Sequence, residues 1–95
     1  MLPKTIQRRH FSMQIIRSGT ATASNYGEAR GAESRSDFVH KLRIVLKELN
    51  KTAVWLQLIG ETNLLSGDKL VPIIAENREL CRIIGASVRT ARGAE

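Results

Sequence analysis

Basic side chains recur at helical spacing in the middle of the chain. His40, Arg43, Lys47 and Lys51 follow one another at intervals of three and four residues, which places them on one face of an α-helix. In an isolated helix, like charges four residues apart repel each other at a cost of about 0.2–0.5 kcal/mol per pair. A polyanion offsets this repulsion, because binding to its phosphates releases counterions. The spacing therefore predicts that Arg43, Lys47 and Lys51 contact RNA or another nucleic acid.

A second basic row is predicted nearer the C-terminus. Arg78, Arg82 and Arg89 fall on one side of a second predicted helix and form the other candidate nucleic-acid contact. An ordinary solvated face is the alternative explanation for both rows, because glutamates lie close to each. Aromatic residues do not interleave with the basic ones, and Phe38 and Trp55 are expected to be buried. The predicted contact therefore involves the nucleic-acid backbone and its shape rather than base stacking.

Residues with catalytic potential are few and scattered. His10 and His40 are far apart in the sequence, and neither a metalloprotease, a phosphate-loop nor a serine-hydrolase motif occurs. Asp37 precedes His40 by three residues, which is more typical of a surface contact than of a catalytic dyad. Cys81 is the single cysteine, so an intramolecular disulfide and a cysteine-based metal cage are excluded. It falls in the row of apolar residues of its predicted helix, where a free thiol is expected to be a small buried hydrophobe. We expect no enzymatic activity, metal, cofactor or small-molecule substrate.

Two long helices are predicted to carry these rows. Residues 37–59 contain a seam at alternating spacings of four and three, made of Phe38, Leu42, Val45, Leu49, Thr52, Leu56 and Ile59. Ser36 or Asp37 is the predicted N-cap of this helix, and the segment Gly60–Gly67 is predicted to form a turn after it. From about Asp68 the same spacing resumes, with Leu70, Ile74, Asn77, Cys81, Ile84, Val88 and Ala91.

The first of these helices has a second apolar patch. Ile44 and Trp55 fall close together at 100° per residue, away from the seam, with Leu58 nearby. A central position in a bundle and a subunit interface explain this patch equally well.

The N-terminal third has no single interpretation from its residues. Residues 4–17 are compatible with a helix that carries Ile6, Met13 and Ile16 on one face. Residues 18–36 are rich in Ser, Gly and Ala, which is typical of a linker. The same small residues also suit a helix that closely approaches a neighbour, so both alternatives stay open.

Length and charge limit the class of protein. A chain of 95 residues with 42% hydrophobic residues can form one domain, 1–95, and is too short for a two-domain enzyme. The net charge of +6 favours a polyanionic partner. We expect a cytoplasmic protein without membrane contact, because no apolar run is long enough to span a bilayer. The acid-free, Arg-bearing start superficially resembles an organelle transit peptide, which is the alternative.

Several short motifs together carry a family resemblance. They are RSGT (17–20), NYxEA (25–29), SDFxxK (36–41), LKE (46–48), WLxL (55–58) and IIxxxVRTAR (83–92). In this order and spacing they resemble the bacterial four-helix bundle family, also called the 23S rRNA intervening-sequence protein family because some members are encoded within large-subunit ribosomal RNA genes. The resemblance extends from about Leu2 to Arg92.

The resemblance implies an all-α, antiparallel up-down bundle that assembles into a basic homopentamer without established enzymatic activity. A similar accessory protein of diversity-generating retroelements works beside a reverse transcriptase and nucleic acid. The resemblance also implies one long helix from about Lys4 to Ser34.

Family members usually carry a further helix before the segment that begins here at Leu2, so only three helices are expected. Their seam positions Ile6, Met13, Phe38 and Leu42 would then be partly uncovered, which favours a homo-oligomer; an assembly scaffold with an acidic protein partner is the alternative to nucleic-acid binding.

Overall fold

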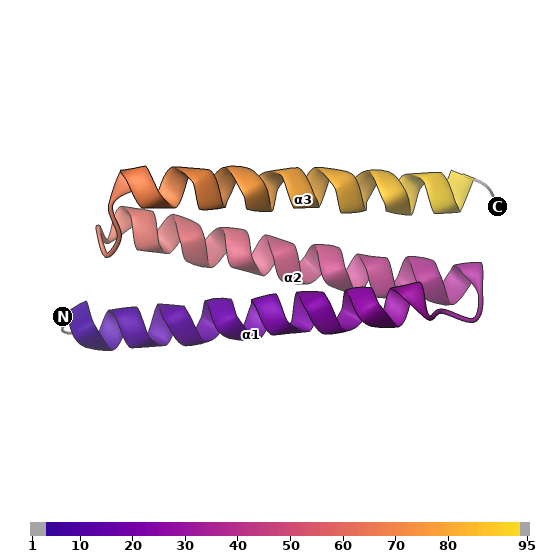
Figure 1. Cartoon of the computed structure of the whole chain (residues 1–95), viewed down its shortest axis with the longest axis horizontal. Coiled ribbons are helices and arrows are strands. Elements are labelled where there is room, and N and C mark those ends of the chain that lie inside the picture. Colours follow the sequence, from indigo (N-terminus) through magenta and orange to yellow (C-terminus); the bar gives the residue numbers. More distant parts are fainter. Residues whose placement is uncertain (1–3, 94–95) are drawn as a thin grey trace.

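The computed structural model describes residues 4–93 of the chain, and this range contains three α-helices. They are α1 (Lys4–Arg30), α2 (Arg35–Glu61) and α3 (Gly67–Gly93), joined by two short loops. Each helix runs antiparallel to its neighbour, with α2 in the middle (Figure 1). No strand occurs within this range. The predicted all-α bundle of three long helices is confirmed, while Leu2, where the family resemblance begins, lies outside the described residues.

Helix α1 continues through residues 18–30, where composition alone left linker and helix open. Thr22 Oγ1 donates a hydrogen bond to the carbonyl of Ser18 at 2.8 Å, so this hydroxyl bonds within its own helix. Ser18 and Ala29 are 3% and 1% exposed, and their small side chains let α1 approach α2 closely. The long helix that the resemblance implied is confirmed, although it ends about a turn earlier, at Arg30.

The N-cap of α2 is Ser34, so the prediction of Ser36 or Asp37 is wrong. The backbone N–H of Asp37 donates to Ser34 Oγ at 3.0 Å, and that of Phe38 donates to the Ser34 carbonyl at 2.9 Å. The Ser34 hydroxyl thereby satisfies one of the amide groups that a helix start leaves unpaired. Asp37 instead lies in the first turn, where its negative charge interacts favourably with the helix dipole.

The loop between α2 and α3 is shorter than the turn predicted for Gly60–Gly67. The backbone N–H and the hydroxyl of Thr62 donate to the Leu58 carbonyl at 3.0 and 2.9 Å, so the helical turn closes beyond Glu61. Asn63 then adopts a φ of 56°, in the left-handed region that Asn tolerates better than most residues. This residue reverses the chain, which allows α3 to start at Gly67.

The core lies along α2, because both outer helices pack on it. No Cα atom of α1 lies within 8 Å of one of α3 among the described helices. The central buried cluster consists of Ala29, Val39, Leu42, Val45, Leu49, Ile84 and Val88. An ion pair between Lys41 Nζ and Glu28 Oε2 at 3.0 Å also joins α1 to α2. The three helices thus form an open bundle, in which α1 and α3 both pack on α2 but not on each other (Figure 1).

Exposure of the seam positions follows from this arrangement. Leu42 is only 1% exposed, so the prediction that it is partly uncovered is wrong. The reason is its position on the middle helix, where α1 and α3 cover it from two sides. Ile6 and Met13 are 50% and 54% exposed, as predicted for α1. Phe38 and Trp55 were expected to be buried, but both are only half-buried.

The second apolar patch of α2 is directed in part toward α1. The Trp55 ring lies 5.9 Å from the Phe11 ring, measured between centroids. This contact favours a central position in the bundle over a subunit interface as the explanation for Trp55. None of the three described helices has a stretch that is both long and apolar enough to cross a membrane.

Candidate nucleic-acid interface

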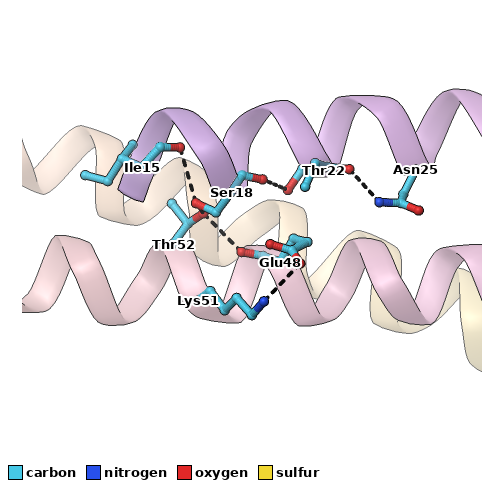
Figure 2. A network of polar contacts seen from close by, with 8 residues as sticks. Ile15, Ser18, Thr22, Asn25, Glu48, Lys51 and Thr52 are labelled. Atoms are coloured by element: carbon cyan, nitrogen blue, oxygen red, sulfur yellow. Dashed lines mark hydrogen bonds and ion pairs between the residues drawn. The ribbon is translucent and has the colours of Figure 1, made fainter. Parts of the chain in front are cut away.

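The predicted basic row of α2 lies on one exposed side of that helix. Arg43, Lys47 and Lys51 are all exposed, whereas the seam that contains Leu42 faces the other helices. Lys51 Nζ forms an ion pair with Glu48 Oε1 at 3.2 Å (Figure 2). The row is therefore accessible, as contact with a polyanion requires.

Three neighbouring surface hollows extend this row onto the other two helices. Lys51 lines the first hollow together with Arg17 of α1. Arg43, Lys47 and Lys51 line the second. Arg43 also lines the third, together with Arg92 of α3. Because Lys51 and Arg43 are each shared between two hollows, these cations form one continuous surface, which we call the basic strip (Arg17, Arg43, Lys47, Lys51 and Arg92).

Acidic side chains are scarce along the basic strip. Glu48 is the one carboxylate among the residues that line the three hollows, and it is paired with Lys51. From Arg43 to Lys51 the strip spans about 12 Å, at a helical rise of roughly 1.5 Å per residue. Charges on one strand of duplex DNA repeat about every 3.4 Å along the axis. The α2 portion alone therefore reaches about three or four phosphates.

The predicted row of α3 consists of three exposed arginines with different neighbours. Arg78 lines a hollow between α2 and α3 that adjoins the basic strip through their common lining residue Asn50. Arg82 Nε instead donates to Glu79 Oε2 at 3.0 Å. This bond holds the pKa of Glu79 below its ordinary value and raises the pKa of Arg82. Arg89 is also exposed and lies three residues before Arg92, a member of the strip, on the same helix.

Sequence reasoning missed Arg17, Arg92 and Trp55 as members of this surface. Arg17 belongs to α1 and Arg92 to α3, whereas each predicted row follows a single helix. Helical spacing orders side chains on one helix, but it does not determine which faces of two helices become neighbours. The half-buried state of Trp55 could not be read from its apolar patch for the same reason.

The histidines and the cysteine do not form a common site. His10 packs edge-on against Trp55, with ring centroids 5.6 Å apart, whereas His40 lines a hollow with Arg43. Cys81 is half-buried rather than buried, and its thiol faces Asn50 Oδ1 at 3.7 Å. Burial raises the pKa of Cys81, which lowers its reactive thiolate fraction. Between residues 4 and 93, no group of three or more His, Cys, Asp or Glu side chains could hold a metal ion.

Fold and surface together define a helical-bundle protein with a positively charged strip across three helices. The chain belongs to the 23S rRNA-intervening sequence protein family, whose model matches residues 1–86. It is also similar to a crystal structure from Bacteroides thetaiotaomicron VPI-5482, described as a protein with unknown function from the S23 ribosomal protein family. The two are 37% identical with a TM-score of 0.79, over 83% of this chain and 70% of that one. No curated protein matches the chain.

Proposed function

We propose that this protein binds RNA or another nucleic acid through its basic strip and catalyses no reaction. The observation that carries this proposal is the continuity of the strip over α1, α2 and α3. Its cations line adjoining hollows in which Glu48 is the one carboxylate. The name of the family refers to intervening sequences of 23S rRNA, which makes RNA the first polymer to test.

Electrostatic energy also supports a polyanionic ligand. Arg43 and Lys47, like Lys47 and Lys51, are separated by one helical turn and repel each other. A phosphate backbone along the strip converts this repulsion into attraction and releases counterions. Along the strip itself the ligand is recognised through its charge and shape, because the members of the strip are Arg and Lys side chains.

Salt dependence is the direct test of this proposal. We expect fluorescence anisotropy with a labelled single-stranded RNA of mixed sequence to detect binding at 50 mM salt. Each phosphate contact on a single strand contributes about −0.7 to the slope of log K against log salt. Five contacts therefore predict an affinity loss of roughly 100-fold between about 50 and 200 mM salt. Affinity that is insensitive to salt would refute the proposal.

Two triple variants separate the strip from net charge. Arg43→Gln/Lys47→Gln/Lys51→Gln removes three cations from the strip. A matched control, Arg78→Gln/Arg82→Gln/Arg89→Gln, removes the same charge from the α3 row. We expect the first variant to lose most of the RNA affinity and the second to lose less, since Arg78, Arg82 and Arg89 line none of the three hollows of the strip. Equal losses would mean that net charge, not the strip, determines binding.

Self-association is the second part of the proposal. Ile6, Met13 and Ile16 of α1 are 50%, 54% and 66% exposed, and at 100° per residue they lie opposite Ser18, which contacts α2. Exposed apolar rows of this kind mark interaction surfaces. We expect a homo-oligomer, with five chains as the number that the family resemblance implies. Light scattering measures this directly, and a monomeric mass would exclude it.

An assembly scaffold that binds an acidic protein is the competing function. It predicts an oligomer of the same mass that fails to bind RNA at any salt concentration. Met13→Glu combined with Ile16→Glu should reduce the mass in light scattering, because both charges enter the apolar row. Val71→Glu, at an exposed α3 position, is the control for an added carboxylate.

A further inference from the structure

The surface between α1 and α2 contains a hollow whose lining differs from the rest of the basic strip. Its residues are Gln14, Arg17, Ser18, Glu48, Lys51, Val54 and Trp55, and its volume is about 390 Å³. This volume is within the range of small-ligand pockets, roughly 300–1,000 Å³. The hollow therefore combines an aromatic ring, a second apolar side chain and two cations in one place.

The indole of Trp55 is held in a fixed orientation by α1. The Phe11 ring lies 5.9 Å from it at an interplanar angle of 43°, and the His10 ring meets it edge-on at 5.6 Å. Trp55 is nevertheless only half-buried, and it is one of the residues that line the hollow. An immobilised aromatic surface loses little entropy when a flat ligand packs against it.

The charges at this hollow suit a nucleotide. Arg17 and Lys51 are exposed members of the basic strip. Lys51 Nζ already contacts Glu48 Oε1 at 3.2 Å (Figure 2), but an ammonium group has three N–H donors. Lys51 can therefore hold Glu48 and a phosphate together. Gln14 adds a side-chain amide, which offers both a donor and an acceptor to the edge of a base.

We propose that the hollow at Trp55 receives one unstacked base of single-stranded RNA, while Arg17 and Lys51 hold its flanking phosphates. This inference rests on the nucleic-acid binding proposed above and adds the form of the ligand. A duplex keeps its base faces stacked, so it contacts the strip through phosphates alone. The protein therefore prefers single strands over duplexes of equal length. Stacking on one aromatic ring contributes about 5- to 160-fold in affinity.

The single tryptophan makes this inference directly measurable, because all indole emission comes from Trp55. The experiment titrates the full chain with a 12-nucleotide oligo(U) and with a 12-base-pair RNA duplex. Intrinsic fluorescence reports on Trp55, and anisotropy of an end label reports on total binding. We expect oligo(U) to quench the emission, whereas the duplex binds without quenching.

Matched variants test the hollow without disturbing the core. Gln14→Glu places a carboxylate in the hollow at almost constant volume. Gln7→Glu makes the same change one heptad earlier on the same side of α1, outside that hollow. We expect the first to weaken oligo(U) binding at least 10-fold and to abolish quenching, and the second to change affinity less than 3-fold. Trp55→Phe should retain most of the preference for single strands, whereas Trp55→Leu should lose it, with circular dichroism verifying the helical fold.

The outcomes separate the two proposals. Salt-dependent binding of both RNAs with equal affinity and unchanged Trp55 emission would overturn the base-binding hollow and leave the basic strip intact. Equal effects of Gln14→Glu and Gln7→Glu would overturn it as well. If neither RNA shows salt-dependent binding, both proposals are overturned: nucleic-acid binding by the basic strip and base binding in the hollow at Trp55.

Discussion

Ser18 Oγ of α1 lies 2.6 Å from Thr52 Oγ1 of α2 (Figure 2). Ser18 Oγ also lies 3.2 Å from the Ile15 carbonyl, and Thr52 Oγ1 lies 3.1 Å from that of Glu48. Two hydroxyl groups have two protons for these three contacts. Two hydroxyl oxygens only 2.6 Å apart need a proton between them, so one hydroxyl donates to the other and the second donates to its own helix. The pair links α1 to α2 whichever hydroxyl donates.

This link predicts energetic coupling between the two residues. Ser18→Ala and Thr52→Val should each lower the free energy of unfolding by about 0.5–1.5 kcal/mol, the typical contribution of such a bond. The double variant should cost about 1 kcal/mol less than the sum, because the bond can be lost only once. Urea unfolding of the four proteins measures this coupling. The Thr22 hydroxyl bonds within α1. The loss of stability caused by Thr22→Val should therefore add to that caused by Thr52→Val, without coupling.

Asn77 is the polar residue buried in the seam of α3. It is 8% exposed, and its Nδ2 donates to the Leu49 carbonyl at 3.1 Å. We expect Asn77→Ala to destabilise the protein by about 1–3 kcal/mol, because it removes a buried hydrogen bond and leaves a void. Asn50→Ala, on the exposed side of α2, should change stability by less than about 0.5 kcal/mol. Similar values for both variants in thermal unfolding would contradict this role.

Two glycines predict different consequences of the same substitution. At Gly19, in the middle of α1, an added Cβ meets no heavy atom within 4 Å. Gly19→Ala should therefore stabilise the protein by about 0.5–1 kcal/mol through helix propensity. At Gly60 the added Cβ would lie 3.0 Å from Leu70 Cδ2, so Leu70 must move. Gly60→Ala should therefore stabilise the protein less than Gly19→Ala does, or destabilise it. Urea unfolding measures both changes, and an equal increase in the free energy of unfolding would show that Leu70 moves without cost.

Cys81 should react slowly in the folded protein. Desolvation raises the pKa of Cys81 above its ordinary value of 9.0, so less thiolate is present at neutral pH. Alkylation with iodoacetamide at pH 8 should therefore be slower in buffer than in urea. Well below pH 9 the Cys81 thiol is neutral in both the folded and the unfolded protein. Above pH 9 the thiol of the unfolded protein ionises first, because its pKa is the lower of the two. Stability should accordingly fall as the pH rises past about 9, and Cys81→Ala should remove that part of the decrease.

Much of the fold could be predicted because helical periodicity is a local property. The seams of α2 and α3 follow from spacings of three and four residues, and their buried members Val45, Leu49, Ile84 and Val88 lie on those seams. The basic row of α2 follows from the same arithmetic, since it occupies the side away from the seam. The helix boundaries do not follow from periodicity, because Ser34 becomes the N-cap only through a specific hydrogen bond from the Asp37 amide.

Helix α1 could not be derived from its composition. Ser, Thr and Gly are weak helix formers, so propensity favours a linker for residues 18–36, although the helix continues to Arg30. Packing overrides propensity here, because small side chains at Ser18 and Ala29 fit closely against α2. The family resemblance indicated the helix because it carries information about packing that local propensity lacks.

The sequence by itself determined two amphipathic helices, their buried seams, the excess of positive charge and the family. Only the tertiary structure decided that Arg17 and Arg92 continue the row of α2, that Arg82 pairs with Glu79, and that Trp55 borders a hollow. The physical reason is that spacing fixes directions around one helix axis. Which directions of neighbouring helices come together depends on how α1 and α3 pack on the two sides of α2.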